Sequence, residues 1–141
     1  MIRVGSNEDC YAVYLLICEM ENCTLCYGDF EKIYSKMMND DAYTIFVALK
    51  DGKVVGEITL RIEEQLHHCA KVAEIMECAV SEKYRCCGFG SRLFKEAYDF
   101  AVRENCVQIE VSSNQVRLRA HTFYERLGMK NTHYKFCMPI S

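Results

Sequence analysis

The chain has 141 residues, of which half are apolar and 26% are charged. This length corresponds to one ordinary domain, so we expect a single domain over residues 1–141 and no separate cofactor domain. Acidic residues outnumber basic residues by 20 to 17, which argues against a nucleic-acid partner. Since no apolar run reaches the roughly 20 residues of a membrane span or follows the plan of a signal peptide, we expect a cytoplasmic protein without a membrane partner.

Ten cysteines are many for this length. Most of them lie within apolar helical or strand patterns, where cysteine acts as a small hydrophobic residue, as at Cys18, Cys78, Cys106 and Cys137. Without a secretory segment, a reduced state is expected. Cys23 and Cys26 form a C-x-x-C pair, but the second pair of a four-ligand zinc site is missing. We therefore predict no metal, and keep a small zinc site built on Cys23, Cys26 and His68 as an alternative.

The first 40 residues predict a strand and two helices. Ile2–Val4 is a short β-branched strand, and Ser6 with Asp9 three residues later has the pattern of a capping box. Apolar residues at helical spacing then continue to about Asn22. A second, weaker helical pattern covers Asp29 to Asn39.

The central segment predicts three strands. Tyr43 to Leu49 and Val54 to Ile62 are rich in β-branched and aromatic residues, and the Asp-Gly pair between them is a strong hairpin signal. Lys71 to Val80 is a third strand pattern. An antiparallel meander is therefore expected.

The last 50 residues alternate between helix and strand. The predicted order is a helix over Gly90 to Arg103, a strand over Val107 to Ser112, a helix over Leu118 to Leu127 that stops at Gly128, and a strand over Lys130 to Met138. The full order βααβββαβαβ predicts an α+β fold, with a mixed, mostly antiparallel sheet and helices packed on it.

A glycine-containing loop lies between the third central strand and the following helix. It contains Gly88 and Gly90, and it leads directly into an amphipathic helix. Free backbone N–H groups and the positive helix end converge there, which is a geometry that binds phosphate groups. A tight turn without a ligand explains the glycines equally well. The Gly-Lys-Ser/Thr ending of a P-loop is absent.

Two segments of the chain resemble signatures of the GNAT N-acetyltransferase superfamily. Arg85, Gly88 and Gly90 match the pyrophosphate-loop pattern Arg/Gln-x-x-Gly-x-Gly/Ala. Asn114, Ala120, Phe123-Tyr124 and Gly128-Met129 match the pattern N-x(5)-A-x-x-F-Y-x-x-x-G-F/Y/M. This resemblance implies the three-layer α/β/α GNAT fold, with helices on both faces of the sheet, and acetyl-CoA as cosubstrate.

A narrower resemblance is to bacterial aminoalkylphosphonate N-acetyltransferases. It rests on Leu66-His67-His68, on residues 73–80, and on residues 114–117 and 120–124. It implies transfer of acetyl from acetyl-CoA to the primary amine of a small molecule, by direct attack of the amine. The alternatives are a GNAT enzyme acting on a protein N-terminus, a polyamine or an antibiotic, and an acyl-CoA-binding or thiol-sensing module without turnover.

The superfamily resemblance also implies a set of acetyl-CoA contacts. The backbone N–H near Val80 is expected to donate to the thioester oxygen, and Asn114 to bond the pantetheine region, although Ser113-Asn114 also suits a helix-cap turn. The full expected set is Cys78, Ala79, Val80, Arg85, Cys86, Cys87, Gly88, Phe89, Gly90, Ser91, Asn114 and Tyr124.

Glu77 is the candidate base for the acceptor amine. An alkylamine at neutral pH is mostly ammonium and has no lone pair to attack with, so a base is required. A carboxylate inside the apolar run of residues 75–80 is costly to bury, which indicates a specific role for it. Strict alternation places Glu77 with Ile75 and Ala79 on one face and Glu74 on the other, so only one of the two acids can point into a given site. The alternative for either acid is an ion pair across the sheet.

The remaining site predictions come from the resemblance. Tyr124 is similar to the tyrosine that assists departure of the CoA thiolate, and a buried aromatic role is its alternative. Arg117 is expected to bind the phosphonate, because its planar fork suits such anions. His67 and His68 are expected substrate contacts. For Arg61, Lys71 and Arg119 a solvated surface role is favoured over anion binding.

Two positions depart from the superfamily pattern. Cys86 occupies a position at which the superfamily most often has glycine. Phe89 occupies a position at which it most often has a small aliphatic residue. If position 86 has a positive φ, its Cβ costs on the order of 1 kcal/mol. A homodimer through edge strands is a further expectation.

Overall fold

The structure is a computed structural model that describes residues 1–140. The chain divides into two compact units, Met1–Glu110 and Val111 onward, which are described separately. The first contains β1 (Ile2–Val4), α1 (Cys10–Glu21), α2 (Tyr27–Met38), β2 (Tyr43–Lys50), β3 (Lys53–Gln65), β4 (Ala70–Val80), α3 (Phe89–Arg103) and most of β5 (Gln108–Val111). The second contains α4 (Leu118–Arg126). Except for the last strand, this is the predicted order, with ends shifted by a few residues.

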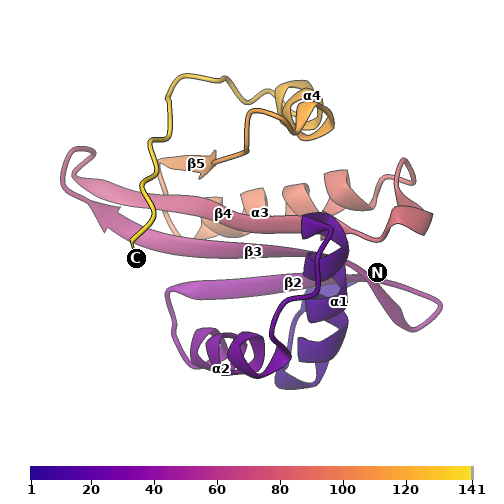
Figure 1. The fold of residues 1–141 in the computed structure, drawn as a ribbon. Helices are drawn as coiled ribbons and strands as arrows, with labels where there is room; N and C mark the ends of the chain where they lie inside the picture. Colours follow the sequence, from indigo (N-terminus) through magenta and orange to yellow (C-terminus); the bar gives the residue numbers. More distant parts are fainter. Residues whose placement is uncertain (141) are drawn as a thin grey trace. The chain divides into compact units, whose positions relative to one another are not determined.

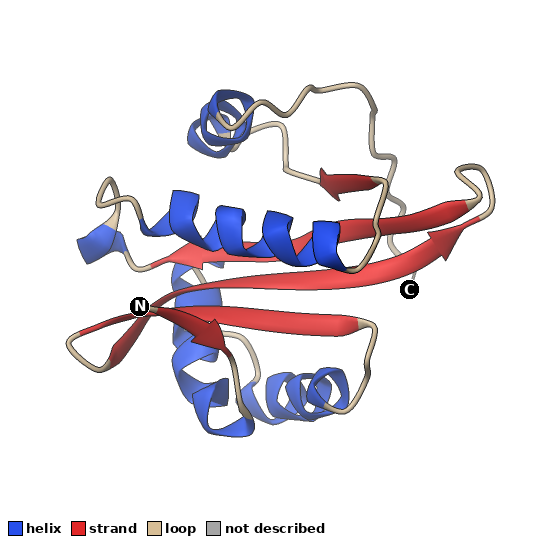
Figure 2. Ribbon diagram, turned by 180° about the vertical axis from the view of Figure 1, so that it is seen from behind, coloured by secondary structure: helices blue, strands red, loops and turns tan. Residues whose placement is uncertain are grey.

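The five strands form one sheet in the order β1-β2-β3-β4-β5. The pairs from β1 to β4 are antiparallel. The arrows of β4 and β5 point the same way in Figure 2, so the sheet is mixed. Helices α1 and α2 cover one face, in front in Figure 1, and α3 covers the other, in front in Figure 2. The α+β class with helices on both faces is thus confirmed.

The predicted β2–β3 hairpin turns through two residues. Asp51 and Gly52 have φ values of 52° and 77°, and Lys50 pairs with Lys53. Positive φ at both central positions is the geometry that matches the twist of a hairpin, and Asp-Gly tolerates it.

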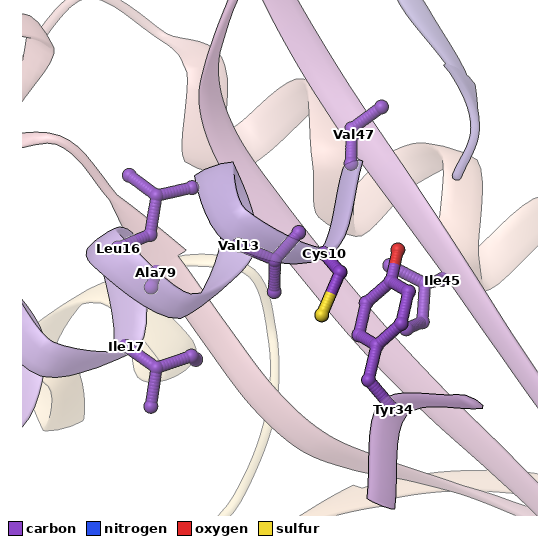
Figure 3. Packing of buried hydrophobic residues seen from close by; sticks show 8 residues of the cluster. All are labelled: Cys10, Val13, Leu16, Ile17, Tyr34, Ile45, Val47 and Ala79. Carbon is purple, nitrogen blue, oxygen red and sulfur yellow. The ribbon is translucent and has the colours of Figure 1, made fainter. Parts of the chain in front are cut away.

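The core lies on both faces of the sheet. Side chains of α1 and α2 pack on Ile45, Val47 and Ala79, as Figure 3 shows. On the other face, the rings of Phe46 and Phe100 are 5.7 Å apart. A Cβ added at Gly56 would lie 3.1 Å from Leu93, so this glycine permits the close approach of α3.

The N-terminal capping box is formed as predicted. The Asp9 carboxylate accepts a hydrogen bond from the Ser6 backbone N–H at 2.8 Å and two from Arg3 at 2.7 and 2.9 Å. The hydrogen bonds from Arg3 lower the pKa of this buried carboxyl. The box orients the entry into α1.

Strand β4 contains a bulge that the alternation rule does not predict. Thr59 pairs with Glu77 and Leu60 pairs with Ile75, which leaves Met76 as the extra residue. Glu74 pairs with Arg61, two positions from Thr59, so Glu74 and Glu77 share one face of the sheet. The predicted separation of the two acids onto opposite faces, with Ile75 beside Glu77, is therefore wrong.

The second unit lacks the last predicted strand. Among the described residues 130–140 there is no helix or strand, so the prediction for Lys130 to Met138 is wrong. Tyr134, Phe136 and Met138 are 82%, 92% and 88% exposed, and Cys137 is exposed too. Alternation of apolar residues forms a strand only where backbone partners pair with it. None of the helices in residues 1–140 is long and apolar enough to span a membrane.

Candidate active site

The loop before α3 presents an exposed helix N-terminus. Cys86 and Gly88 have φ values of 63° and 85°, and both are exposed. The Arg92 N–H donates to the Gly88 carbonyl at 3.1 Å, which is the first helical hydrogen bond. The N–H groups of residues 89–91 precede that bond and point out of the helix end with its partial positive charge. This geometry suits a phosphate or pyrophosphate group.

Phe89 anchors the loop rather than lining it. Its side chain is 5% exposed, its ring lies 6.1 Å from that of Tyr84 in an edge-on arrangement, and the Arg92 guanidinium lies 4.5 Å above it. Only the backbone of Phe89 is thus available to a ligand. Arg85 and Cys87 are exposed.

The C-terminal part of β4 extends beyond β5. The Val107 N–H bonds to the Lys71 carbonyl at 2.9 Å, and β5 runs only from Gln108 to Val111. Since each strand residue advances about 3.3 Å, β5 ends well before Val80 (Figure 1). Within residues 1–140, the β4 backbone over Cys78, Ala79 and Val80 has no neighbouring strand on that side. Its edge groups can bond a ligand lying alongside.

Glu77 lies half-buried on the face of the sheet that α1 covers. Burial raises the pKa of its carboxyl, and the negative charges of Glu21 on α1 and Glu74 on β4 raise it further. A carboxylate whose pKa is moved upward toward neutrality is a better proton acceptor than an ordinary surface glutamate.

A second carboxyl, Glu57, lies on the same face and is 0% exposed. It pairs with Ala79, beside the pair of Thr59 with Glu77. Thr59 Oγ1 donates to Glu57 Oε2 at 2.8 Å, and Glu57 Oε1 has no hydrogen-bond partner in the described residues. Burial raises the pKa of Glu57 well above its usual range, and the charge of Glu77 adds to this. Of the two carboxyls, Glu57 is therefore the one whose surroundings favour the neutral form more strongly.

The ion-pair alternative holds for Glu74. Arg61 lies opposite it and donates to Glu74 Oε1 at 3.2 Å and to Glu63 Oε2 at 3.0 Å. Arg61 is thus paired with two carboxylates on the α1-covered face. The prediction that it extends freely into solvent is therefore wrong.

Three predicted site residues lie in the second unit. Asn114 Oδ1 accepts a hydrogen bond from the Val116 N–H at 3.0 Å, so the predicted turn before a helix is present. Arg117 is exposed at the N-terminal end of α4, and Tyr124 is half-buried within α4 beside Phe123, with ring centroids 5.2 Å apart.

His67 and His68 lie in the turn between β3 and β4, with ring centroids 4.3 Å apart. The eight residues of β4 from Ala70 to Glu77 span roughly 20 Å. The structure therefore does not bring the two histidines together with Glu77, and a small amine cannot contact both places at once.

No metal cluster occurs among residues 1–140: no three His, Cys, Asp or Glu side chains there are placed to hold an ion. No disulfide links any of the ten cysteines in the described part of the chain. A shallow pocket lies between the end of α3 and Val107–Ile109, and none of the predicted site residues lines it.

Sequence reasoning missed the roles of Glu57 and Arg61 in this face. The signal for Glu57 was present, because a carboxyl inside the apolar run Val54–Leu60 is as unusual as Glu77 in its own strand. Nothing in the local sequence marks Arg61, since its partner Glu74 is identified only by strand register.

Comparisons with known proteins identify relatives of this chain. Residues 7–129 match the profile described as the acetyltransferase (GNAT) family. The chain is 35% identical, over 96% of its length and 88% of the relative, to an aminoalkylphosphonate N-acetyltransferase of Salmonella typhimurium. It is 28% identical to human N-acetylaspartate synthetase over 74% of this chain, which corresponds to 32% of that protein.

Solved structures share the fold at low sequence identity. A transcriptional regulator from Bacillus halodurans superposes with a TM-score of 0.91 at 20% identity, covering 99% of both chains. An aminoglycoside 6'-N-acetyltransferase from Acinetobacter haemolyticus gives 0.85 at 13% identity, covering 100% of this chain and 98% of that one. The profile match and the 35% identical relative establish that the chain belongs to the GNAT family of acetyl-CoA-dependent N-acetyltransferases.

Proposed function

We propose that this acetyltransferase moves the acetyl group from acetyl-CoA to the primary amine of a small anionic molecule, an aminoalkylphosphonate or an amino acid-like anion. The observation that carries the proposal is the 35% identity over nearly the whole chain to an aminoalkylphosphonate N-acetyltransferase. The two units act together as one domain, which the family match across their boundary at residue 110 supports.

Glu77 is the base in this proposal. Its carboxylate takes one proton from the acceptor ammonium, and the amine nitrogen then bonds to the thioester carbonyl carbon. The carbon–sulfur bond breaks to release the CoA thiolate, and the second proton lost from nitrogen passes to that thiolate. The upward-shifted pKa of Glu77 supports this role, because an efficient base has a pKa near the working pH. Glu57 stays protonated and does not compete for the proton.

The acetyl-CoA contacts follow the open backbone of β4 and the loop before α3. The N–H groups at the start of α3 hold the pyrophosphate, with Arg85 to Ser91 around it, and the exposed positive-φ backbone supports this. The edge of β4 over Ala79 and Val80, where β4 has no further neighbouring strand among the described residues, bonds the pantetheine and the thioester oxygen. Asn114 contributes through the atoms that its turn leaves available.

Tyr124 assists departure of the CoA thiolate. A phenol with an ordinary pKa of about 10 does not fully protonate a thiolate of pKa about 8.5, so a hydrogen bond is sufficient. We expect Tyr124→Phe to lower kcat by about tenfold or more while the Kd of acetyl-CoA stays within about twofold, measured by steady-state kinetics and calorimetry. Equal losses in kcat and in acetyl-CoA affinity would make Tyr124 a structural residue.

Arg117 binds the anionic group of the acceptor. Its exposure and its place before α4 support this, and an arginine offers two parallel N–H donors to a phosphonate. His67 and His68 contact the acceptor only if it is long enough to reach the turn between β3 and β4.

A polyamine is a second candidate acceptor, and one observation favours it. Glu21 and Glu74 place negative charge around Glu77, and the cation nearest to Glu74, Arg61, is already paired. Such a surrounding attracts cationic molecules.

The test is mass-spectrometric detection of acetylated products from acetyl-CoA and a mixture of amines. The mixture contains aminomethyl- and aminoethylphosphonate, amino acids, spermidine and an N-terminal peptide. Mass detection is preferred to a thiol assay, because the protein has ten cysteines. Preferential acetylation of a phosphonate supports the proposal, whereas preference for spermidine replaces it with the second candidate.

A further inference from the structure

Polar side chains form a connected row on the α1-covered face of the β3–β4 hairpin. His68 Nδ1 lies 2.7 Å from Gln65 Oε1, and Gln65 Nε2 donates to Glu63 Oε1 at 3.0 Å. Arg61 donates to the other oxygen of Glu63 at 3.0 Å and to Glu74 at 3.2 Å. Residues 61, 63 and 65 share a face because they alternate along β3. The row therefore runs from the hairpin turn to Glu74.

Arg61 is the cationic member of this row. A hydrogen bond with Tyr43 on β2 raises its pKa, and the charges of Glu63 and Glu74 raise it further. Its guanidinium therefore stays charged at every pH of interest. The side chains of Arg61 and Glu74 are 31% and 26% exposed, so solvent screens their attraction less than at a fully exposed pair.

The row ends beside Glu77. The bulge at Met76 turns Glu74 onto the face of Glu77, and the charge of Glu74 raises the pKa of Glu77. The other acidic groups around Glu77 are Glu21 on α1 and Glu57 on β3, whose pKa burial raises. Arg61 therefore determines how much of the Glu74 charge acts on Glu77.

We propose that Arg61 is a positioning residue for Glu77, acting through its ion pair with Glu74. The pair holds the Glu74 carboxylate toward β3 and offsets its charge, so that Glu77 remains available as a proton acceptor in a face crowded with carboxylates. This inference rests on the proposed role of Glu77 as the base.

The test is the pH dependence of kcat/KM in wild type, Arg61→Gln, Glu74→Gln and the double variant. Arg61→Gln leaves Glu74 unpaired, which raises the pKa of Glu77. The acid limb of the pH profile, where kcat/KM falls as Glu77 becomes protonated, therefore moves to higher pH. We expect a three- to tenfold loss of kcat/KM on that limb and no loss on the alkaline plateau, since a tenfold loss corresponds to about one pH unit. Glu74→Gln moves the limb to lower pH, and the double variant follows Glu74→Gln.

Lys95→Gln is the matched control. It removes the same charge from an exposed ion pair with Asp99, 2.8 Å away on α3, and should leave the limb in place. Arg61→Lys should restore most of the wild-type limb. The proposal is overturned if the acid limb of the pH profile shifts no further in Arg61→Gln than in Lys95→Gln. An equal loss at every pH also overturns it, because that indicates a purely structural role.

A second readout does not need turnover. Glutamate labelled with ¹³C at the side-chain carboxyl allows NMR titration of the free protein, with Glu77 assigned by its loss in Glu77→Gln. The Glu77 midpoint should rise in Arg61→Gln and fall in Glu74→Gln. If it does not move, the Arg61 proposal fails and the proposed function stands. If it moves but Glu77→Gln acetylates normally, the base is another group, so the proposed roles of Glu77 and Arg61 both fail while the proposed acetyl transfer stands.

Discussion

The strand β4 and the loop that follows it are adjacent in sequence, but each holds a different kind of unfavourable group. On β4 and its partner β3, Glu77 and Glu57 place carboxyls in a face that helices cover, and Glu57 is fully buried. In the loop, Cys86 is an exposed non-glycine residue with a φ of 63°. The cost is electrostatic in the first region and conformational in the second. Substitutions should therefore relieve the two regions in different ways.

The largest effect is expected at the half-buried carboxylate. Glu77→Gln removes the base but keeps the size of the side chain, so kcat/KM at pH 7 should fall by about 100-fold or more. The loss should shrink as the pH approaches the pKa of the acceptor amine, because the free amine no longer needs a base. Glu64→Gln, an exposed position on β3, is the control. A fall of less than threefold would remove Glu77 from the reaction.

An intermediate effect is expected at Glu57. Its folded-state pKa lies above the unfolded value, so its contribution to stability is complete below pH 4.5 and is lost as the pH rises toward the folded pKa. Glu57→Met should raise the free energy of unfolding at pH 8 by about 1 kcal/mol, after the loss of the Thr59 hydrogen bond, and by less at pH 4.5. Urea denaturation at both pH values measures this. The same change at both pH values would mean that Glu57 is not the protonated group.

The smallest effect is expected in the loop. Cys86→Gly removes the Cβ from a left-handed residue, which should add roughly 0.5–1 kcal/mol to the free energy of unfolding. If the strained loop is the one that binds pyrophosphate, the Kd of acetyl-CoA should change by no more than a few fold. Cys87→Gly is the control, because Cys87 has no positive φ and glycine there should destabilise the chain. Equal effects at the two positions would mean that position 86 is not strained.

Local patterns predicted the regular elements well where a tertiary partner was available. The Asp51-Gly52 turn and the Ser6–Asp9 capping box depend on neighbouring residues only, and both formed as predicted. The strand over Lys130 to Met138 was predicted from the same kind of alternation, and the structure has none there. A strand needs a partner for its backbone groups, and the sequence of the segment does not contain that information.

The site was predicted in part. The loop of residues 85–91 is recognisable because its glycines and the following helix are contiguous in the chain. Glu77 is recognisable as a charge in an apolar run. The bulge at Met76 is not, because one extra residue in β4 becomes visible only when its register with β3 is known. That one residue decides that Glu74 is a neighbour of Glu77.

The amino-acid sequence by itself determined the order of elements up to α4, the loop before α3 and the GNAT resemblance, because all three depend on residues close together in the chain. Only the tertiary structure decided that Glu57 is fully buried, that Arg61 pairs with Glu74, and that β4 extends past β5. Those features arise from strand register and burial. Both depend on how distant segments pair, and they set the electrostatic surroundings of Glu77.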